Sequence, residues 1–172
     1  MLTTERLFVR EFKVDDWKDV YEMNTSAEVM KSIGNGQIKT IEEEKNGFEN
    51  ILLSYEKNSR LGIWAVTLKT DGTLIGAASM TILDGTNEIQ IGYRFKKEYW
   101  GQGYATEVTK GLLDYGFDHL KLKRIVATAN LTNDRSRRVL EKAGLKFERT
   151  GTFYDLEMNY FAMTAPSEQN TI

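Results

Sequence analysis

Three short apolar segments follow one another between residues 62 and 95, and Asp-Gly dipeptides separate them. The segments cover residues 62–68, 73–82 and 88–95, with turns at Asp71-Gly72 and Asp84-Gly85. Apolar runs of this length joined by such dipeptides are typical of antiparallel strands connected as hairpins. The middle of the chain is therefore predicted to form an antiparallel sheet of three strands.

The hydrophobic pattern changes period on both sides of this sheet. Helices are predicted after Asp15 or Asp16, which can serve as an N-cap, and over residues 40–55, 105–120 and 133–143. Thr40 and Glu43 have the spacing of a capping box. Strands are predicted over 6–12, 124–129, 145–149 and 155–163. The order predicts one mixed α/β domain over residues 1–163, followed by a polar tail over 164–172.

The composition excludes several kinds of site. The 172 residues contain no cysteine and one histidine, so a disulfide framework, a thiol nucleophile and a two-histidine metal site are excluded. No apolar run approaches the roughly 20 residues of a membrane span. The first residues do not resemble a signal peptide. We therefore expect a cytoplasmic protein that binds neither a metal nor a membrane.

Basic residues are concentrated in one third of the chain. Residues 94–149 contain 13 basic and 7 acidic side chains, a net of +6, whereas the remaining residues contain 10 and 18, a net of −8. A basic region of this kind favours an anionic ligand. Chance sorting of solvated surface charge would give the same counts. The region lacks the interleaved aromatic residues that stack nucleic-acid bases, so direct nucleic-acid binding is not expected.

Two glycines lie between a predicted strand and a predicted helix, in the segment YWGQGYATE of residues 99–107. Gly101 and Gly103 let the backbone approach a ligand closely, and the unpaired amides of the following helix turn attract an anion. Together they predict a cradle for a pyrophosphate. A tight turn alone would explain them as well. Thr106 stands where a dinucleotide fingerprint has its third glycine, and no P-loop lysine follows.

A second segment, residues 133–144, opens the last predicted helix. Asn133 is a good N-cap, and Gly144 ends the helix. Ser136 lies on the apolar stripe, so its hydroxyl is expected to face inward or into a cleft. A small residue required for packing is the alternative explanation.

These motifs resemble those of the GNAT superfamily of acetyl-CoA-dependent N-acetyltransferases. The resemblance covers roughly residues 2–163 and rests on WGQGYATE, NxxSxxVLEKxG, TERLxxR at the start and Ile91-Gly92-Tyr93. It is nearest to the branch of RimJ/RimL-type ribosomal-protein N-terminal acetyltransferases. It implies a single-domain, mostly antiparallel seven-stranded sheet with about four flanking helices. It also implies a homodimer.

The same resemblance implies the substrates. Acetyl-CoA is the donor, and the acceptor is a primary amine, with a protein N-terminal amine first and a polyamine or antibiotic amine second. The acceptor cleft is expected between residues 24–48 and 154–160. The run Glu42-Glu43-Glu44 is expected to be a solvated first helical turn. The alternative is that it attracts a cationic amine.

The resemblance also assigns site residues. Phe95 falls on the strand position whose main chain pairs with the pantetheine arm and whose amide polarises the thioester carbonyl. Asn133 and Ser136 fall on positions that line the pantetheine and sulfur end. Three arginines are candidates to bind the adenosine phosphates of coenzyme A: Arg135, Arg137 and Arg138. A solvated helix face is the alternative explanation for them. The cofactor loop consists of Trp100, Gly101, Gln102, Gly103, Tyr104, Ala105 and Thr106.

Two positions depart from the family pattern. Leu140 stands where many members have a tyrosine that protonates the thiolate, and Gln90 stands where many have a carboxylate base. We therefore assign the acid role to Ser136 and the base role to Glu88, which is two residues from Gln90 on the same predicted face. A solvent-facing Glu88 is the alternative. The two departures also leave open a catalytically weak acyl-CoA-binding regulatory module.

Overall fold

One eight-stranded mixed sheet organises the computed structural model, which describes residues 2–57 and 60–166. Its order is β1-β2-β3-β4-β5-β6-β8-β7, and every neighbouring pair is antiparallel except β5 and β6. The fold class is confirmed, with one more strand than expected because the chain starts with a two-residue strand. The strands are β1 (Leu2–Thr3), β2 (Leu7–Arg10), β3 (Gly62–Leu68), β4 (Leu74–Ile82), β5 (Ile89–Phe95), β6 (Arg124–Asn130), β7 (Lys146–Phe153) and β8 (Leu156–Thr164).

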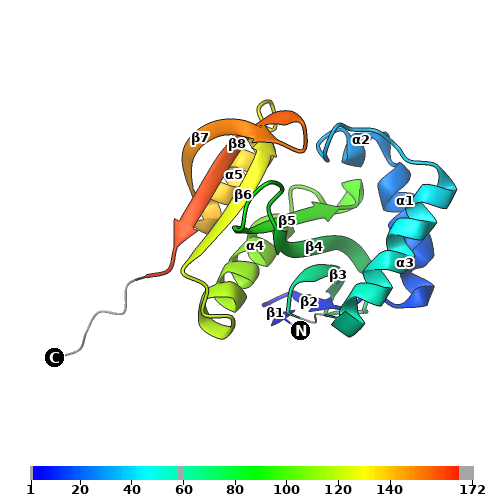
Figure 1. Ribbon diagram of the computed structural model, residues 1–172. Helices are drawn as coiled ribbons and strands as arrows, with labels where there is room; N and C mark the ends of the chain where they lie inside the picture. The colour runs from blue at the N-terminus through cyan, green and yellow to red at the C-terminus, as the bar shows by residue number, and fades with distance from the viewer. Residues whose placement is uncertain (1, 58–59, 167–172) are drawn as a thin grey trace.

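The helices form two groups with the sheet between them (Figure 1). The first group contains α1 (Trp17–Thr25), α2 (Ala27–Met30) and α3 (Ile41–Lys57), and the second contains α4 (Tyr104–Asp114) and α5 (Asp134–Ala143). Within the described residues there are thus five α-helices rather than about four, because the short α2 was not predicted. The expected helix over 105–120 ends as an α-helix at Asp114 and continues as one π-helical turn, Tyr115–His119.

Each face of the sheet buries its own apolar cluster. Ile91 and Phe95 of β5 pack with α4 and α5 residues such as Leu112 and Leu140. The opposite face packs Phe48 and its neighbours from α1 and α3 against β3 and β4. Successive strand residues point to opposite faces. The even-numbered residues of β5 therefore face the side covered by α1 and α3.

The helix caps predicted from the sequence are present, with one exception. The capping box is present, since Thr40 N–H donates to Glu43 Oε2 (2.8 Å) and Glu43 N–H to Thr40 Oγ1 (3.3 Å). Asp16 does not cap α1 with its side chain, and that prediction was wrong. Its carboxylate instead accepts two hydrogen bonds from Arg10, at 2.6 and 3.0 Å, and one from the Lys13 amide, at 2.7 Å. A guanidinium offers a bidentate, charge-assisted pair, which is stronger than a bond to one helix amide.

The end of the chain is ordered further than expected. β8 continues to Thr164, where the tail was predicted to start, and Ala165 N–H donates to the Lys123 carbonyl. Residues 167–172 of the expected tail lie outside the described part of the chain.

Glu107 joins the N-terminal strands to α4. Its Oε1 accepts from the Thr4 hydroxyl (2.6 Å) and the Arg6 amide (2.7 Å), and its Oε2 accepts from Arg6 Nε (2.7 Å). Burial alone would raise the pKa of Glu107, but these hydrogen bonds outweigh it and lower that pKa. An ionised carboxylate is therefore part of the folded structure.

This lowered pKa predicts a pH dependence of stability. The Glu107 contribution is complete above the unfolded-state value near 4.5 and is lost as the pH falls through the lower folded-state value. Glu107→Gln should reduce the free energy of unfolding by about 1–2 kcal/mol at pH 7. Urea unfolding of both proteins between pH 7 and pH 3.5 checks this. The difference between them should shrink below pH 4.5, and a constant difference would contradict the assignment.

Candidate functional site

β5 and β6 are parallel neighbours that separate after a single pairing. Among the described residues the register joins only Gln90 to Val126. Beyond that point Lys96 N–H donates to the carbonyl of Ile75 in β4, the neighbour of β5 on the other side. Strand amides alternate in direction, so the amides of Phe95 and Tyr93 point the other way, toward the gap beside β6. The gap thus presents main-chain donors that no strand uses.

The glycine loop follows directly from the end of β5. Trp100 Nε1 donates to the Phe95 carbonyl (2.8 Å), which fixes the start of the loop against the strand. Gly101 and Gly103 have φ of +77° and +85°, a region that favours glycine, and Gly103 is the N-cap of α4. The amides of the first α4 turn have no intrahelical carbonyl to pair with. The loop therefore directs unpaired donors and the positive end of a helix dipole to one place.

Arg6 supports the loop from the other end of the sequence. Its Nη1 donates to the Gln102 carbonyl (3.0 Å), and its guanidinium lies 4.4 Å from the Tyr104 ring centroid. Gln102 Nε2 donates to the Glu98 carbonyl (2.9 Å). With these carbonyls engaged, the first amides of α4 are the main-chain groups of the loop left without a helical partner. This is the polarity that an anion requires.

The start of α5 lies across the gap from β5. Asn133 Oδ1 accepts from the Ser136 amide (3.0 Å), as expected for an N-cap. The Tyr93 hydroxyl donates to Ser136 Oγ (3.2 Å), so the serine hydroxyl proton remains available for a third group. Burial raises the pKa of Tyr93. Sequence reasoning missed Tyr93 because its contact to Ser136 joins residues 43 positions apart.

Arg135 connects the two motifs. Its guanidinium lies 5.6 Å from the Trp100 ring centroid, within the range of a cation–π contact. Arg137 lies along the exposed side of α5, where it pairs with Glu141 at 3.6 Å. Arg135 is thus the predicted arginine that the structure brings to the loop.

Glu88 lies at the opposite end of β5 from Phe95. Its carboxylate accepts from the Tyr160 hydroxyl (2.6 Å) and from Arg124 Nε (3.2 Å). Positions 88 and 95 are seven steps apart along extended chain, roughly 23 Å at about 3.3 Å per step. The structure therefore does not bring Glu88 to the Phe95 amide.

The two departures from the family pattern have structural roles here. Gln90 Nε2 donates to the Tyr154 hydroxyl in the turn between β7 and β8. Leu140 is 2% exposed and belongs to the core beneath α4 and α5. Neither position supplies an acid or a base.

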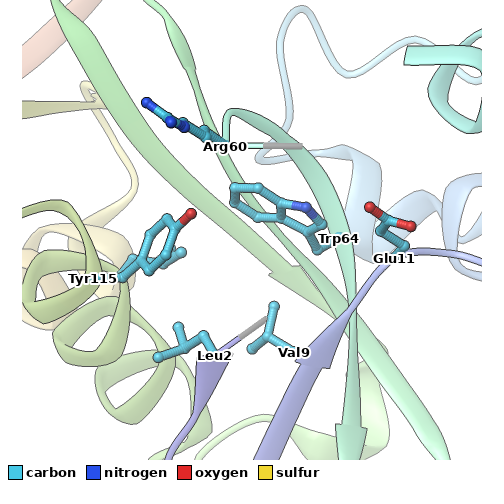
Figure 2. A pocket seen from close by; sticks show the side chains of 7 residues that line it. Leu2, Val9, Glu11, Arg60, Trp64 and Tyr115 are labelled. Atoms are coloured by element: carbon cyan, nitrogen blue, oxygen red, sulfur yellow. The ribbon is translucent and has the colours of Figure 1, made fainter. Parts of the chain in front are cut away.

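A separate hollow of about 290 Å³ lies on the α4 side of the sheet, near β1–β3. Figure 2 shows Leu2, Val9, Trp64 and Tyr115 around it, with Glu11 and Arg60 at its rim. None of the predicted site residues lines it. The region from residue 2 to 57 and from 60 to 166 contains no cluster of three metal-ligating side chains and no helix suited to cross a membrane.

Comparison with known proteins agrees with this geometry. Residues 6–146 match the model of the acetyltransferase (GNAT) domain. The chain is 35% identical over 147 residues to the uncharacterized N-acetyltransferase YnaD of Bacillus subtilis, covering 86% of this chain and 83% of that protein.

Solved structures give the same result. A GNAT-family acetyltransferase from Bacillus anthracis superimposes with a TM-score of 0.79 at 31% identity, covering 95% and 97% of the two chains. RimL, a ribosomal L7/L12 α-N-protein acetyltransferase solved with coenzyme A, shares the fold at a TM-score of 0.77 and 14% identity, over 94% and 96%. The glycine loop and the diverging strands thus belong to a member of the GNAT family, an acetyl-CoA-dependent N-acetyltransferase.

Proposed function

We propose that this acetyltransferase modifies the α-amine of a peptide or protein N-terminus, as RimJ/RimL-type enzymes do. The observation that supports a peptide acceptor most directly is a buried carboxylate, Glu44, that acts electrostatically on the Arg94 guanidinium on the α1 and α3 side of β5. A small amine such as a polyamine is the alternative acceptor. A homodimer in the cytoplasm remains part of the proposal, and sedimentation velocity tests the dimer.

The donor substrate is proposed to bind along the gap between β5 and β6. The amides of Gln102 to Thr106 hold its pyrophosphate, with Trp100 and Gly101 shaping the entry to the loop. Asn133 and Ser136 line the opposite wall. Unpaired amides at a helix start, with positive-φ glycines before them, are the donor set that a pyrophosphate needs.

The acetyl transfer depends mainly on the alignment of the amine with the thioester carbonyl. The amine must lose a proton before it attacks the thioester carbonyl, and the gap holds the two reactants in line. The Phe95 amide is the proposed donor to the carbonyl oxygen as negative charge develops there. Ser136 is the proposed proton donor to the departing thiolate, and the Tyr93 hydroxyl bonded to its Oγ can then restore that proton.

Glu88 enters the proposal only as a remote proton acceptor. Arg124 and Tyr160 hold its carboxylate, and the length of β5 keeps it from the Phe95 amide. Any proton it receives must therefore travel through water.

The strand length predicts a weak effect of removing the Glu88 charge. Glu88→Gln should lower kcat by well under the roughly 10²-fold typical of a base that contacts its substrate. Steady-state assays with acetyl-CoA and an accepted amine measure it. A fall of 10²-fold or more with an unchanged fold would show that Glu88 acts directly.

Substitutions of Ser136 and Tyr93 should lower kcat to different extents. Ser136→Ala should lower kcat roughly 10²-fold or more, because the proposed proton donor is lost. Tyr93→Phe keeps the serine and should have a smaller effect. The KM for acetyl-CoA should change little in Tyr93→Phe. Equal kcat values for Ser136→Ala and wild type would remove the serine from the mechanism.

Substitution of Gly103 should weaken coenzyme A binding by more than its effect on stability explains. Gly103→Ala places a Cβ at φ +85°, which costs about 1–2 kcal/mol, at 3.3 Å from Arg6 Nη2. The added methyl group also lies in the loop whose backbone is proposed to approach the pyrophosphate. Calorimetry should show coenzyme A affinity reduced roughly tenfold or more. Gly72→Ala is the matched control, because Gly72 has φ +78° in the remote hairpin turn with open space around it. The control should lose similar stability and keep its affinity, so equal affinity losses in both would refute the loop assignment.

A further inference from the structure

Two of the three glutamates at the start of α3, Glu42 and Glu43, are exposed as the sequence suggested, but the third is not. Glu44 is 7% exposed, and Asn24 of α1 is 5% exposed. Asn24 Nδ2 donates to Glu44 Oε2 at 2.6 Å. A carboxylate is rarely buried without partners, because desolvation disfavours its charge. This buried pair therefore needs an explanation.

Asn24 also has an unused acceptor. Across residues 2–57 and 60–166, its Oδ1 is the buried side-chain polar atom found without a hydrogen-bond partner. Buried polar atoms are normally paired, and exceptions often mark a place where another group binds. The free oxygen lies on the same carboxamide that holds Glu44, so the two acceptors belong to one cluster.

Arg94 brings the opposite charge to this cluster. It is the residue before Phe95 in β5, on the side of the strand that faces α1 and α3. Glu44 attracts its guanidinium electrostatically, yet no hydrogen bond to that guanidinium occurs within the described chain. Burial lowers the pKa of Arg94, and the charge of Glu44 opposes that change. The guanidinium thus has donors with no described partner, within electrostatic reach of the Glu44 carboxylate.

We propose that Asn24, Glu44 and Arg94 form the acceptor subsite, and that it recognises an amine whose neighbouring carbon bears a carbonyl, as in a peptide N-terminus. Asn24 Oδ1 and Glu44 accept N–H groups of the amine. Arg94 donates to the adjacent carbonyl oxygen. A polycation satisfies only the first two groups and is repelled by the third. The inference rests on the proposed peptide-acceptor function and names the residues that would recognise that acceptor.

The position of the cluster suits this role. The Phe95 ring lies on the α4 side, 6.4 Å from the Tyr104 ring centroid, whereas Arg94 faces the other side of the same strand. Lys96 Nζ pairs with Asp19 of α1 at 2.6 Å, which fixes the helix that bears Asn24 to the end of β5. Donor and acceptor thus approach one strand end from opposite faces of the sheet.

The first experiment measures acceptor use in the full-length protein. Wild type, Glu44→Gln and Glu42→Gln are assayed with acetyl-CoA and twenty pentapeptides that differ only in their first residue. Release of coenzyme A is followed with a thiol reagent, to which this cysteine-free protein adds no background. Glu42 is exposed in the same helical turn and serves as the matched control.

We expect Glu44→Gln to raise the KM for the preferred peptide roughly tenfold or more, because a hydrogen bond to a charged group is lost. Glu42→Gln should match wild type. Coenzyme A affinity, measured without peptide, should be equal in all three proteins. Equal peptide KM values in Glu44→Gln and wild type would overturn the subsite. Failure of wild type to bind coenzyme A would instead overturn the proposed function.

The second experiment tests the carbonyl. Arg94→Met removes a side chain that makes no hydrogen bond within the described chain, so the fold should persist, and urea unfolding checks this. Wild type should use alaninamide with a kcat/KM at least tenfold above that of isopropylamine, which has no carbonyl. Arg94→Met should lose most of that preference. A wild-type preference for isopropylamine or spermidine, or a preference unchanged in Arg94→Met, would overturn the proposal.

Discussion

The separation of β5 from β6 is the constraint on which the rest of the site depends. Parallel strands normally use each other's amides along their length, but here the described pairing stops at Gln90 and Val126. The sheet is continued on the far side by the antiparallel β8 and β7. An opening therefore exists in the middle of a sheet whose two halves are each well paired. Main-chain donors remain free inside a stable fold, without loss of the surrounding core.

Ion pairs connect the two halves of the site. Lys96 reaches Asp19 of α1, and Lys97 pairs with Glu28 of α2. Both lysines lie between β5 and the glycine loop. Exposed pairs of this kind contribute little to stability, but the Lys96 side chain is only 12% exposed. The segment that starts the donor loop is thereby tied to the helices that cover the acceptor face.

Sequence reasoning succeeded where the signal was local. The Asp-Gly turns, the Thr40 cap, the Asn133 cap and the Gly144 stop each depend on residues within a few positions. It failed where a distant partner decides. The Asp16 carboxylate binds Arg10 and the Lys13 amide rather than an amide of α1. The two-residue β1 is too short to give a periodic pattern.

The site divides in the same way. The glycine loop and Ser136 follow from motifs, whereas Tyr93 and the Asn24–Glu44–Arg94 cluster exist only through contacts between segments far apart in sequence. Glu88 illustrates the limit in the other direction. Period-two reasoning predicted that Glu88 shares a face with Gln90, but Glu88 lies just before β5, and the length of the strand separates it from the reaction centre proposed at Phe95.

The Trp100 indole has a consequence for any molecule that enters the gap. Because it donates to the Phe95 carbonyl, the strand end keeps a free N–H while its oxygen is already engaged. At the Phe95 position the opening therefore offers a hydrogen-bond donor and no free acceptor, so a ligand oxygen is favoured there over a ligand N–H. An inhibitor built for it should place a carbonyl or sulfonyl oxygen there, since an amide N–H in the same place would find only another donor.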